Sequence, residues 1–148
     1  FATVASPGRL EVVRTGPTVM LDAAHNPHGA QALATALAEE FSFDRLVGVV
    51  GVLADKDAAG ILGALEPVLD HVVVTQAATP RVMAADDLAA IAAEVFGDDR
   101  VSVEPGLLDA LDTALALVDD PDATGGMGVV VTGSVITAGQ ARALLAGS

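Results

Sequence analysis

The chain has no cysteine, tryptophan or tyrosine, and it has few lysines and arginines. Because cysteine is absent, no disulfide can form, and this composition suits a reducing compartment, so we expect a cytoplasmic protein. Long apolar runs are also missing, since glycine or charged residues interrupt each hydrophobic stretch. We therefore expect no membrane-spanning segment and no membrane partner.

Positive charge is scarce, because 7 Lys and Arg residues stand against 20 Asp and Glu residues and give a formal net charge of −13. Such a surface repels the phosphate backbone of DNA and RNA, whose binding normally needs clustered cations. The chain also has few aromatic side chains on which bases could stack, with 4 Phe, no Trp and no Tyr. These absences exclude nucleic acid as a partner. Because cationic side chains are scarce, each one near a predicted site is a stronger candidate for binding a ligand.

What the chain does contain is a regular alternation of strand and helix patterns. Its 148 residues, 52% of them hydrophobic, suit a single domain over residues 1–148. Strands are predicted at 9–14, 18–21, 46–50, 72–75, 101–103 and 129–132, and helices at 27–40, 57–69, 86–96, 106–118 and 137–145. The first two strands flank turn residues and predict a hairpin, whereas the later strands alternate with helices, which implies parallel pairing. The expected fold class is α/β: a Rossmann-like three-layer domain with a mainly parallel six-stranded sheet and one antiparallel edge strand.

The most informative stretch is Leu21–Gly29 (L-D-A-A-H-N-P-H-G), where a strand pattern passes into a helix pattern. Asn26 suits the N-cap of that helix, and Pro27 suits its first turn. In a parallel sheet this junction lies at the carboxyl end of the strand, where ligands, and anionic ligands in particular, bind. Asp22 and His25 are therefore the leading candidates for a functional site.

Each polar residue of this stretch also has a purely structural interpretation. Asp22 can satisfy the amides of its own loop, and Asn26 can act as a helix cap alone. His25 has no packing reason to be histidine at an exposed loop position, which favours contact with a ligand. His28, on the first helical turn, and His71, before a strand, are expected at the surface.

Three further predicted loops bring polar residues to the same edge of the sheet. They contain Lys56 and Asp57 (A-D-K-D), Arg81 (T-P-R) and Ser134 (T-G-S). A structural interpretation exists here too, because Asp57 and Ser134 can each cap a helix while Lys56 is solvated. The chain has no G-x-x-x-x-G-K-[ST] phosphate loop, no G-x-G-x-x-G after its first strand and no carboxylate cluster for a metal. The residues alone thus predict an α/β domain with a polar site whose other half lies elsewhere.

Five short motifs, taken in order, resemble the carboxyl-terminal domain of folylpolyglutamate synthase, which shares its fold with the Mur ligases of cell-wall synthesis. They are P-G-R at 7–9, D-A-A-H-N-P at 22–27, L-A-D-K-D at 53–57, T-P-R at 79–81 and V-T-G-S at 131–134. The resemblance spans nearly the whole chain in one register. It departs at Ala23, where the family commonly has glycine, a small change in backbone freedom.

The resemblance implies a piece of a larger enzyme. The family's amino-terminal ATPase domain, with its phosphate loop, its Mg2+ ligands and most of its folate pocket, is not within these 148 residues, and the first residue is Phe1 rather than methionine. The implied reaction is ATP-dependent amide formation, in which the γ-carboxylate of a folate is phosphorylated and the amine of glutamate then attacks the acyl phosphate. Dihydrofolate synthase activity is a further expectation of the same resemblance.

Residue roles follow from the matched motifs. The resemblance gives Asp22 the nucleotide ribose or a metal-bound water, and it gives His25 the phosphates near the forming intermediate, so these two are the expected catalytic residues. Arg9 is expected on the nucleotide, at the transferring phosphate or a substrate carboxylate, because a guanidinium binds either group with two prongs. Asn26 completes the nucleotide site as helix cap and loop support.

Substrate binding is expected from three other residues. Ser134, at a helix amino terminus, would hold the carboxylate of the incoming glutamate, and Lys56 and Arg81 lie on the same rim. The implied cofactors are ATP and Mg2+, with the metal ligands mainly in the amino-terminal domain. The implied partners are glutamate, a folate and that ATPase domain.

Two other functions are compatible with the sequence. One is a Mur-type ligase that joins an amino acid to a cell-wall precursor, with the same chemistry and a different acceptor. The other is a flavodoxin-like binding or phospho-receiver domain without catalysis. The receiver fits less well, because it needs an acid after its third strand and a lysine after its last, where this chain has Gly51 and Gly133.

Overall fold

A six-stranded sheet forms the centre of the computed structural model, which describes residues 10–119 and 125–146. The strands are β1 (Glu11–Arg14), β2 (Thr18–Leu21), β3 (Phe43–Val50), β4 (His71–Val74), β5 (Val101–Val103) and β6 (Gly126–Thr132), in the order β1-β2-β6-β3-β4-β5. β1 pairs with β2 in antiparallel fashion at one edge, and the other neighbouring strands pair in parallel. The expected fold class, with its antiparallel edge strand, is confirmed.

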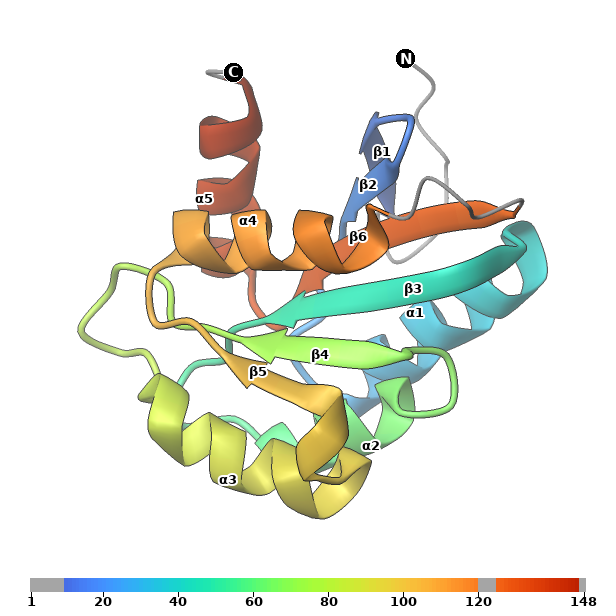
Figure 1. Ribbon diagram of the computed structural model, residues 1–148. Coiled ribbons are helices and arrows are strands. Elements are labelled where there is room, and N and C mark those ends of the chain that lie inside the picture. Colours follow the sequence, from blue (N-terminus) through green and yellow to red (C-terminus); the bar gives the residue numbers. More distant parts are fainter. Residues whose placement is uncertain (1–9, 120–124, 147–148) are drawn as a thin grey trace.

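Helices cover both faces of this sheet. They are α1 (Pro27–Glu40), α2 (Ala58–Leu65), α3 (Ala85–Phe96), α4 (Leu107–Val118) and α5 (Val135–Ala146), with a short 3-10 helix at Asp98–Arg100. α1, α2 and α3 lie on one face, and α4 and α5 lie on the other (Figure 1). The domain therefore has three layers. No helix within the described ranges is long and apolar enough to cross a membrane.

The valine-rich strands are apolar on both faces because both faces are covered. Successive side chains of a strand point to opposite sides of the sheet. Val72 and Val74 accordingly pack with Leu62 of α2, whereas Val73, between them, packs with Leu111 of α4. Strands buried on both sides are continuous apolar runs in the sequence, and such strands are typical of parallel sheets. For this reason the sequence pattern predicted the parallel strands correctly.

The position of β6 determines where the site lies. The chain runs from β2 through α1 to β3, continues outward to β4 and β5, and then returns through α4 to β6, between β2 and β3. In open α/β sheets, ligands bind beyond the carboxyl ends of the strands where the strand order reverses. The Asp22 amide donates to the Val131 carbonyl at 3.0 Å and the Gly51 amide donates to the Thr132 carbonyl at 3.2 Å, so the loops after β2, β3 and β6 meet at this edge.

Some element boundaries differ from the predicted ones. α2 ends at Leu65 instead of residue 69, because Pro67 has no amide hydrogen to continue the helical bonding, although Glu66 before it keeps helical backbone angles, φ −54° and ψ −42°. β3 begins at Phe43 instead of residue 46, because Phe43 pairs with Gly126 of β6 and its ring stacks on Phe41 with centroids 5.3 Å apart. Proline acts locally and can be read from the sequence, whereas the strand pairing is a tertiary contact.

The expectation that His71 is a surface residue was wrong. His71 is the first residue of β4 and is half-buried, with Nε2 at 2.8 Å from the Ser102 hydroxyl of β5. Burial lowers the pKa of His71 below its ordinary value of 6.5, and the charges of Arg45 and Arg100 lower it further. The amino ends of these strands lie opposite the predicted site, so His71 is a structural residue.

Candidate functional site

The loop after β2, residues 22–26, folds around the side chain of Asp22. Asp22 is 2% exposed, and its Oδ2 accepts a hydrogen bond from the Ala24 amide at 2.9 Å. The Ala24 carbonyl in turn accepts from the Gly133 amide at 3.2 Å, which joins this loop to the one after β6. Asp22 therefore does satisfy a loop amide, and in this conformation it shapes the loop that carries His25.

His25 lies exposed in the same loop. Its Nδ1 is 3.2 Å from the Ala23 carbonyl oxygen. Because a carbonyl only accepts, Nδ1 carries the hydrogen in this contact, and Nε2 of the neutral ring is then an acceptor. If the ring gains a proton, Nε2 becomes a donor without any change in the Nδ1 contact. The exposed edge of the ring can thus accept from a hydroxyl group or donate to a phosphate.

Helix α1 begins next to His25. Asn26 has extended backbone angles, φ −149° and ψ 167°, and its Oδ1 accepts from the Gly29 amide at 2.7 Å, so the predicted N-cap is confirmed. Pro27 follows at the start of the helix, where no amide donor is needed. The positive end of the helix dipole therefore faces this loop. A cavity of about 180 Å³ opens here, lined by residues 22–26, 28 and 29.

The loop between β6 and α5 is packed too tightly for any residue but glycine at position 133. Gly133 has φ 113°, and a Cβ atom there would lie 2.3 Å from the Gly51 carbonyl oxygen. The Ser134 Oγ accepts from the Thr137 amide and donates to the Thr137 Oγ1, both at 2.8 Å. Thr137 Oγ1 then donates to the Gly51 carbonyl at 2.9 Å. This chain of bonds fixes the start of α5 onto the loop after β3.

Ser134 is consequently placed differently from its expected role. It is 1% exposed, and its hydroxyl group is used as donor and as acceptor inside the protein. In the described conformation this hydroxyl is a helix cap, which agrees with the structural interpretation of Ser134. The next residue, Val135, is 59% exposed, so the surface of the first turn of α5 is open to solvent.

The loop after β3 lies beside the start of α1. Asp57 caps α2, because its Oδ1 accepts from the Gly60 amide at 2.9 Å, which agrees with the structural interpretation of that residue. A Cβ atom on Gly60 would lie 2.6 Å from Pro27 Cγ, so the first turns of α1 and α2 are in close contact. Lys56, partly exposed just before the cap, is therefore held near the His25 loop.

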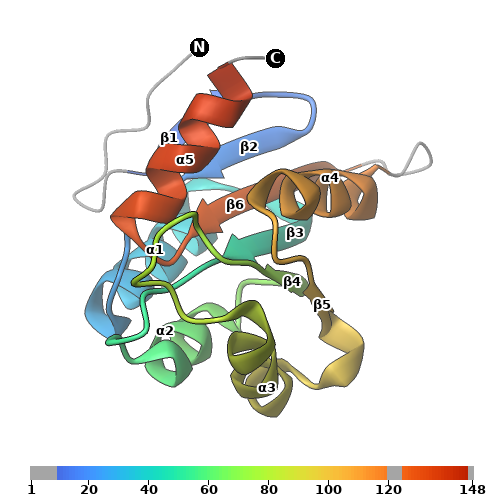
Figure 2. The ribbon, with the colours of Figure 1, turned by 90° about the vertical axis from the view of Figure 1, so that its left-hand side faces the viewer.

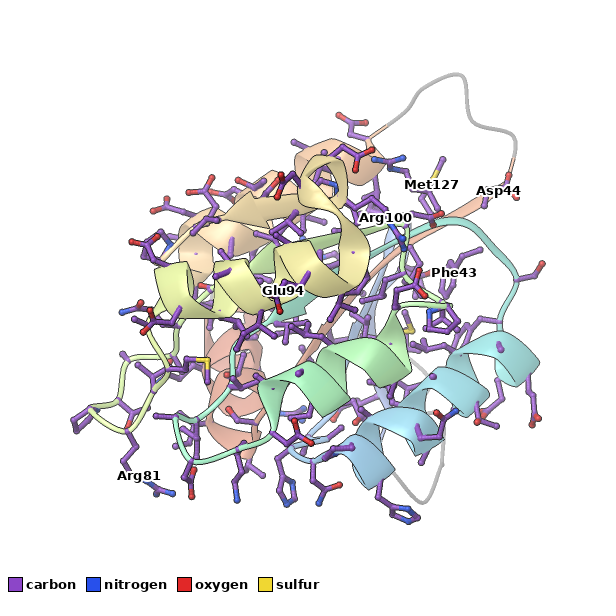
Figure 3. The ribbon with its side chains drawn as sticks, turned by 90° about the horizontal axis from the view of Figure 1, so that it is seen from below. Phe43, Asp44, Arg81, Glu94, Arg100 and Met127 are labelled. Carbon is purple, nitrogen blue, oxygen red and sulfur yellow. The ribbon has the colours of Figure 1, made fainter. Side chains whose placement is uncertain are left out.

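The loop after β4 carries Arg81 at the same edge. Its carbonyl accepts from the Ala54 amide at 2.9 Å, and Val82 forms a bridge with Leu53, so the loops after β3 and β4 are joined. Arg81 is exposed and points outward, on the opposite side of the molecule from Asp44 and Met127 at the amino ends of β3 and β6 (Figure 3). Figure 2 looks onto this carboxyl edge of the sheet.

The structure thus joins the loops that carry His25, Lys56 and Arg81 at the carboxyl edge of the sheet, with His25 directly before the amino terminus of α1. Such an arrangement suits an anionic ligand. Arg9 lies outside the described residues. Within 10–119 and 125–146, no group of three His, Asp or Glu side chains is placed to hold a metal ion.

Two hollows among the described residues are several times larger than the cavity beside His25. One, of about 680 Å³, is at the amino ends of β2 and β6, which is the edge where ligands do not bind in such sheets. The other, of about 690 Å³, is lined by uncharged residues, among them Gln76, Leu108 and Gln140. The small cavity beside His25 matches the polar chemistry best. Sequence reasoning missed Thr137 and Gln140, whose roles depend on contacts with distant loops.

Comparison with known proteins identifies the family of the chain. The family model for "Mur ligase, glutamate ligase domain" matches residues 8–135. The dihydrofolate synthase/folylpolyglutamate synthase of Mycobacterium tuberculosis is 57% identical over 152 residues, which cover 97% of this chain and 31% of that protein.

Two solved structures are also similar. Mycobacterium tuberculosis folylpolyglutamate synthase complexed with ADP matches with a TM-score of 0.90 and 58% identity, over 98% of this chain and 33% of that one. E. coli FolC in complex with DHPP and ADP matches with a TM-score of 0.80 and 30% identity, over 96% of this chain and 32% of that one. The chain therefore spans between 31% and 33% of the length of these relatives. With its family model matched over most of its length, the chain belongs to the Mur ligase family, as a glutamate ligase domain.

Proposed function

We propose that this chain is the carboxyl-terminal domain of an ATP-dependent ligase that adds glutamate to folates, a folylpolyglutamate synthase that also acts as dihydrofolate synthase. The observation that carries the proposal is the joining of the loops of His25, Lys56 and Arg81 at the carboxyl edge of the sheet, beside the cavity at the start of α1. It is supported by relatives that bear both activity names and by two similar structures that hold ADP.

The proposed reaction has two steps. A carboxylate oxygen of the folate attacks the γ-phosphorus of ATP, the bond to the β-phosphate oxygen breaks, and ADP leaves. The amine of glutamate then attacks the acyl carbon, phosphate leaves with the electron pair of the C–O bond, and the amine proton passes to solvent or to a base. Both steps are governed by charge neutralisation and by the placement of the reacting atoms.

The residues of this chain supply binding and orientation in that reaction. In its protonated form His25 donates from Nε2 to a phosphate oxygen, while the dipole of α1 stabilises negative charge beside it. Lys56 and Arg81 bind carboxylate or phosphate groups of the substrates from the neighbouring loops. Asp22 holds the His25 loop in shape from its buried position, and Ser134 fixes the first turn of α5, whose amides face the incoming glutamate. Arg9 is assigned to the transferring phosphate.

The remaining machinery is proposed to lie in an amino-terminal ATPase domain of a longer protein. That domain would hold a phosphate loop, the Mg2+ ligands and most of the folate pocket, and Mg2+ would neutralise the triphosphate. The two domains would form one active site only when they close on each other. The absence of cysteine suits such an enzyme in the cytoplasm.

A substrate panel on the full-length protein tests the proposal. With ATP, L-glutamate and either a reduced folate or dihydropteroate, we expect a product heavier by one glutamyl residue, detected by mass spectrometry, and one ADP released for each product. Reactions without glutamate should release no ADP in excess of the background.

The same panel separates the alternatives. Turnover with nucleotide-linked muramyl acids and none with folates would identify a cell-wall ligase and overturn the proposal. No turnover with any acceptor, together with labelling of an aspartate by acetyl phosphate, would identify a phospho-receiver domain instead.

A further inference from the structure

Gln140 of α5 makes a two-point contact with the loop after β4. Its Oε1 accepts from the Ala78 amide at 2.8 Å, and its Nε2 donates to the Ala78 carbonyl at 3.3 Å. One orientation of the carboxamide satisfies both groups, because the amide needs an acceptor and the carbonyl needs a donor. The side chain thus pairs with Ala78 as a neighbouring strand would, across a separation of 62 residues.

The loop that Gln140 holds is the one that carries Arg81. The two ends of this loop are joined, because Gln76 Oε1, just after β4, accepts from the amide of Ala85, the first residue of α3, at 2.8 Å. In its middle, the Arg81 carbonyl accepts from the Ala54 amide at 2.9 Å. These contacts join the loop to α3 and to the loop after β3, and Gln140 joins it to α5.

Helix α5 is itself fixed at the site. Its first turn is tied through Ser134 and Thr137 to the Gly51 carbonyl. Its far side is tied to β1 by the ion pair of Arg142 with Glu11. Gln140 joins the anchored first turn of α5 to the loop of Arg81, whose own residues Ala77–Pro80 include no buried side chain larger than alanine.

We propose that Gln140 is a positioning residue for the ligase reaction, which holds the Arg81 loop in the conformation that meets the substrate. This inference rests on the proposed function. In this role Gln140 does not contact the substrate. It keeps the loop ordered before the substrate arrives, so binding does not have to supply the free energy of ordering the loop. Its loss therefore weakens binding more than it slows the chemical step.

The test compares three single variants and one double variant of the full-length protein. Gln140→Met keeps the length of the side chain and loses both bonds. Arg142→Gln is the matched control, because it removes a polar contact from the same helix without touching the loop. Arg81→Ala shows which substrate Arg81 binds, and the double variant Arg81→Ala/Gln140→Met tests whether the two residues act together.

We expect Gln140→Met to raise the KM of the substrate that Arg81→Ala identifies by about 10-fold, with kcat within about 2-fold of the wild type. In the Arg81→Ala background, Gln140→Met should add little, since the residue that it positions is gone. Arg142→Gln should leave KM unchanged. A wild-type KM in Gln140→Met, an equal rise in Arg142→Gln, or full additivity with Arg81→Ala would each overturn the proposal.

A spectroscopic measurement checks the contact itself. In a 15N-1H spectrum of the 148-residue chain, the Ala78 amide signal should move in Gln140→Met and stay in place in Arg142→Gln. Gln140→Glu should restore the signal only on acidification through about pH 4, where the protonated carboxyl group can again both accept and donate. An unmoved Ala78 signal in Gln140→Met would overturn the inference, whereas an inactive wild-type enzyme with a moved signal would overturn the proposed function.

Discussion

His25 and His28 are both exposed and lie three residues apart, but only His25 belongs to the loop between β2 and α1. Replacing His25 by alanine removes one hydrogen bond to a charged phosphate, which is worth about 1.5–3 kcal/mol, so we expect turnover of the full-length enzyme to fall by about 10- to 100-fold. Because the ring is exposed, the free energy of unfolding should change by less than about 0.5 kcal/mol. Steady-state assays and urea unfolding measure the two effects.

The matched control is His28→Ala, which makes the same chemical change on the first turn of α1. We expect its turnover to stay closer to that of the wild type, because His28 borders the same cavity but lies on the helix, outside the loop that carries His25. Equal losses in the two variants would contradict the special role of His25, and a loss of stability in His25→Ala would show that the ring supports the fold instead.

At the scale of single residues, local contacts were predictable and distant ones were not. The Asn26 cap was predicted correctly because its partner, Gly29, lies three residues ahead in the same turn. The burial of Ser134 could not be predicted from the sequence, since it depends on contacts of the loop with Thr137 and Gly51. The pairing of Gln140 with Ala78 leaves no local trace in the sequence at all.

At the scale of elements, α5 offers two glycines with opposite requirements. Gly133 precedes the helix with φ 113° and lies against the Gly51 carbonyl, so alanine there is strained and clashes. Gly139 lies within the helix, and a Cβ atom on it would meet nothing within 4 Å. We expect Gly133→Ala to destabilise the domain by at least about 2 kcal/mol and Gly139→Ala to stabilise it by about 0.5–1 kcal/mol.

Urea unfolding of the two variants, followed by circular dichroism, measures these changes. The comparison is internally controlled, because both substitutions are Gly→Ala and lie six residues apart around one helix. A destabilised Gly139→Ala variant would mean that α5 does not continue through residue 139. An unchanged stability in Gly133→Ala would contradict the close contact between Gly133 and the Gly51 carbonyl.

The elements themselves followed closely from periodicity and caps. Both ends of α1 were predicted, because Asn26 and Pro27 mark its start and the apolar spacing continues to Glu40. The strand order was not predictable in the same way. β6 lies between β2 and β3 because the returning α4 crosses the sheet, and no local pattern specifies that neighbour.

At the scale of the whole molecule, His71 predicts a dependence of stability on pH. Its pKa in the folded state is lowered below 6.5 by burial and by Arg45 and Arg100, against a smaller opposing effect of Asp99. The unfolded chain therefore binds the proton more readily than the folded one, so the folded state loses stability as pH falls from about 7.5 through about 6. Glu11 acts in a separate and lower range, because its hydrogen bond to Arg142 lowers its pKa from 4.5.

Urea unfolding between about pH 8 and about pH 5 measures this loss. In His71→Gln, which keeps a polar group near Ser102 and removes the titration, the unfolding free energy should fall less over the same interval. If the variant and the wild type lose stability in parallel across that interval, His71 is not the group responsible.

The last prediction concerns what the 148-residue chain does alone. Its two apolar clusters lie on the two faces of one sheet and contain members of all five helices, so it has a complete core and should unfold in one cooperative transition. Its net charge of −13 opposes polyphosphate binding, and among the described residues the proposed ligand contacts come from the loops after β2, β3, β4 and β6. We therefore expect a folded protein whose amide signals at residues 22–29 shift weakly with ADP and which forms no amide product from ATP, glutamate and folate. Measurable ligase activity from this chain by itself would show that the site is already complete, and that the proposed closure of a second domain onto His25, Lys56 and Arg81 is not needed.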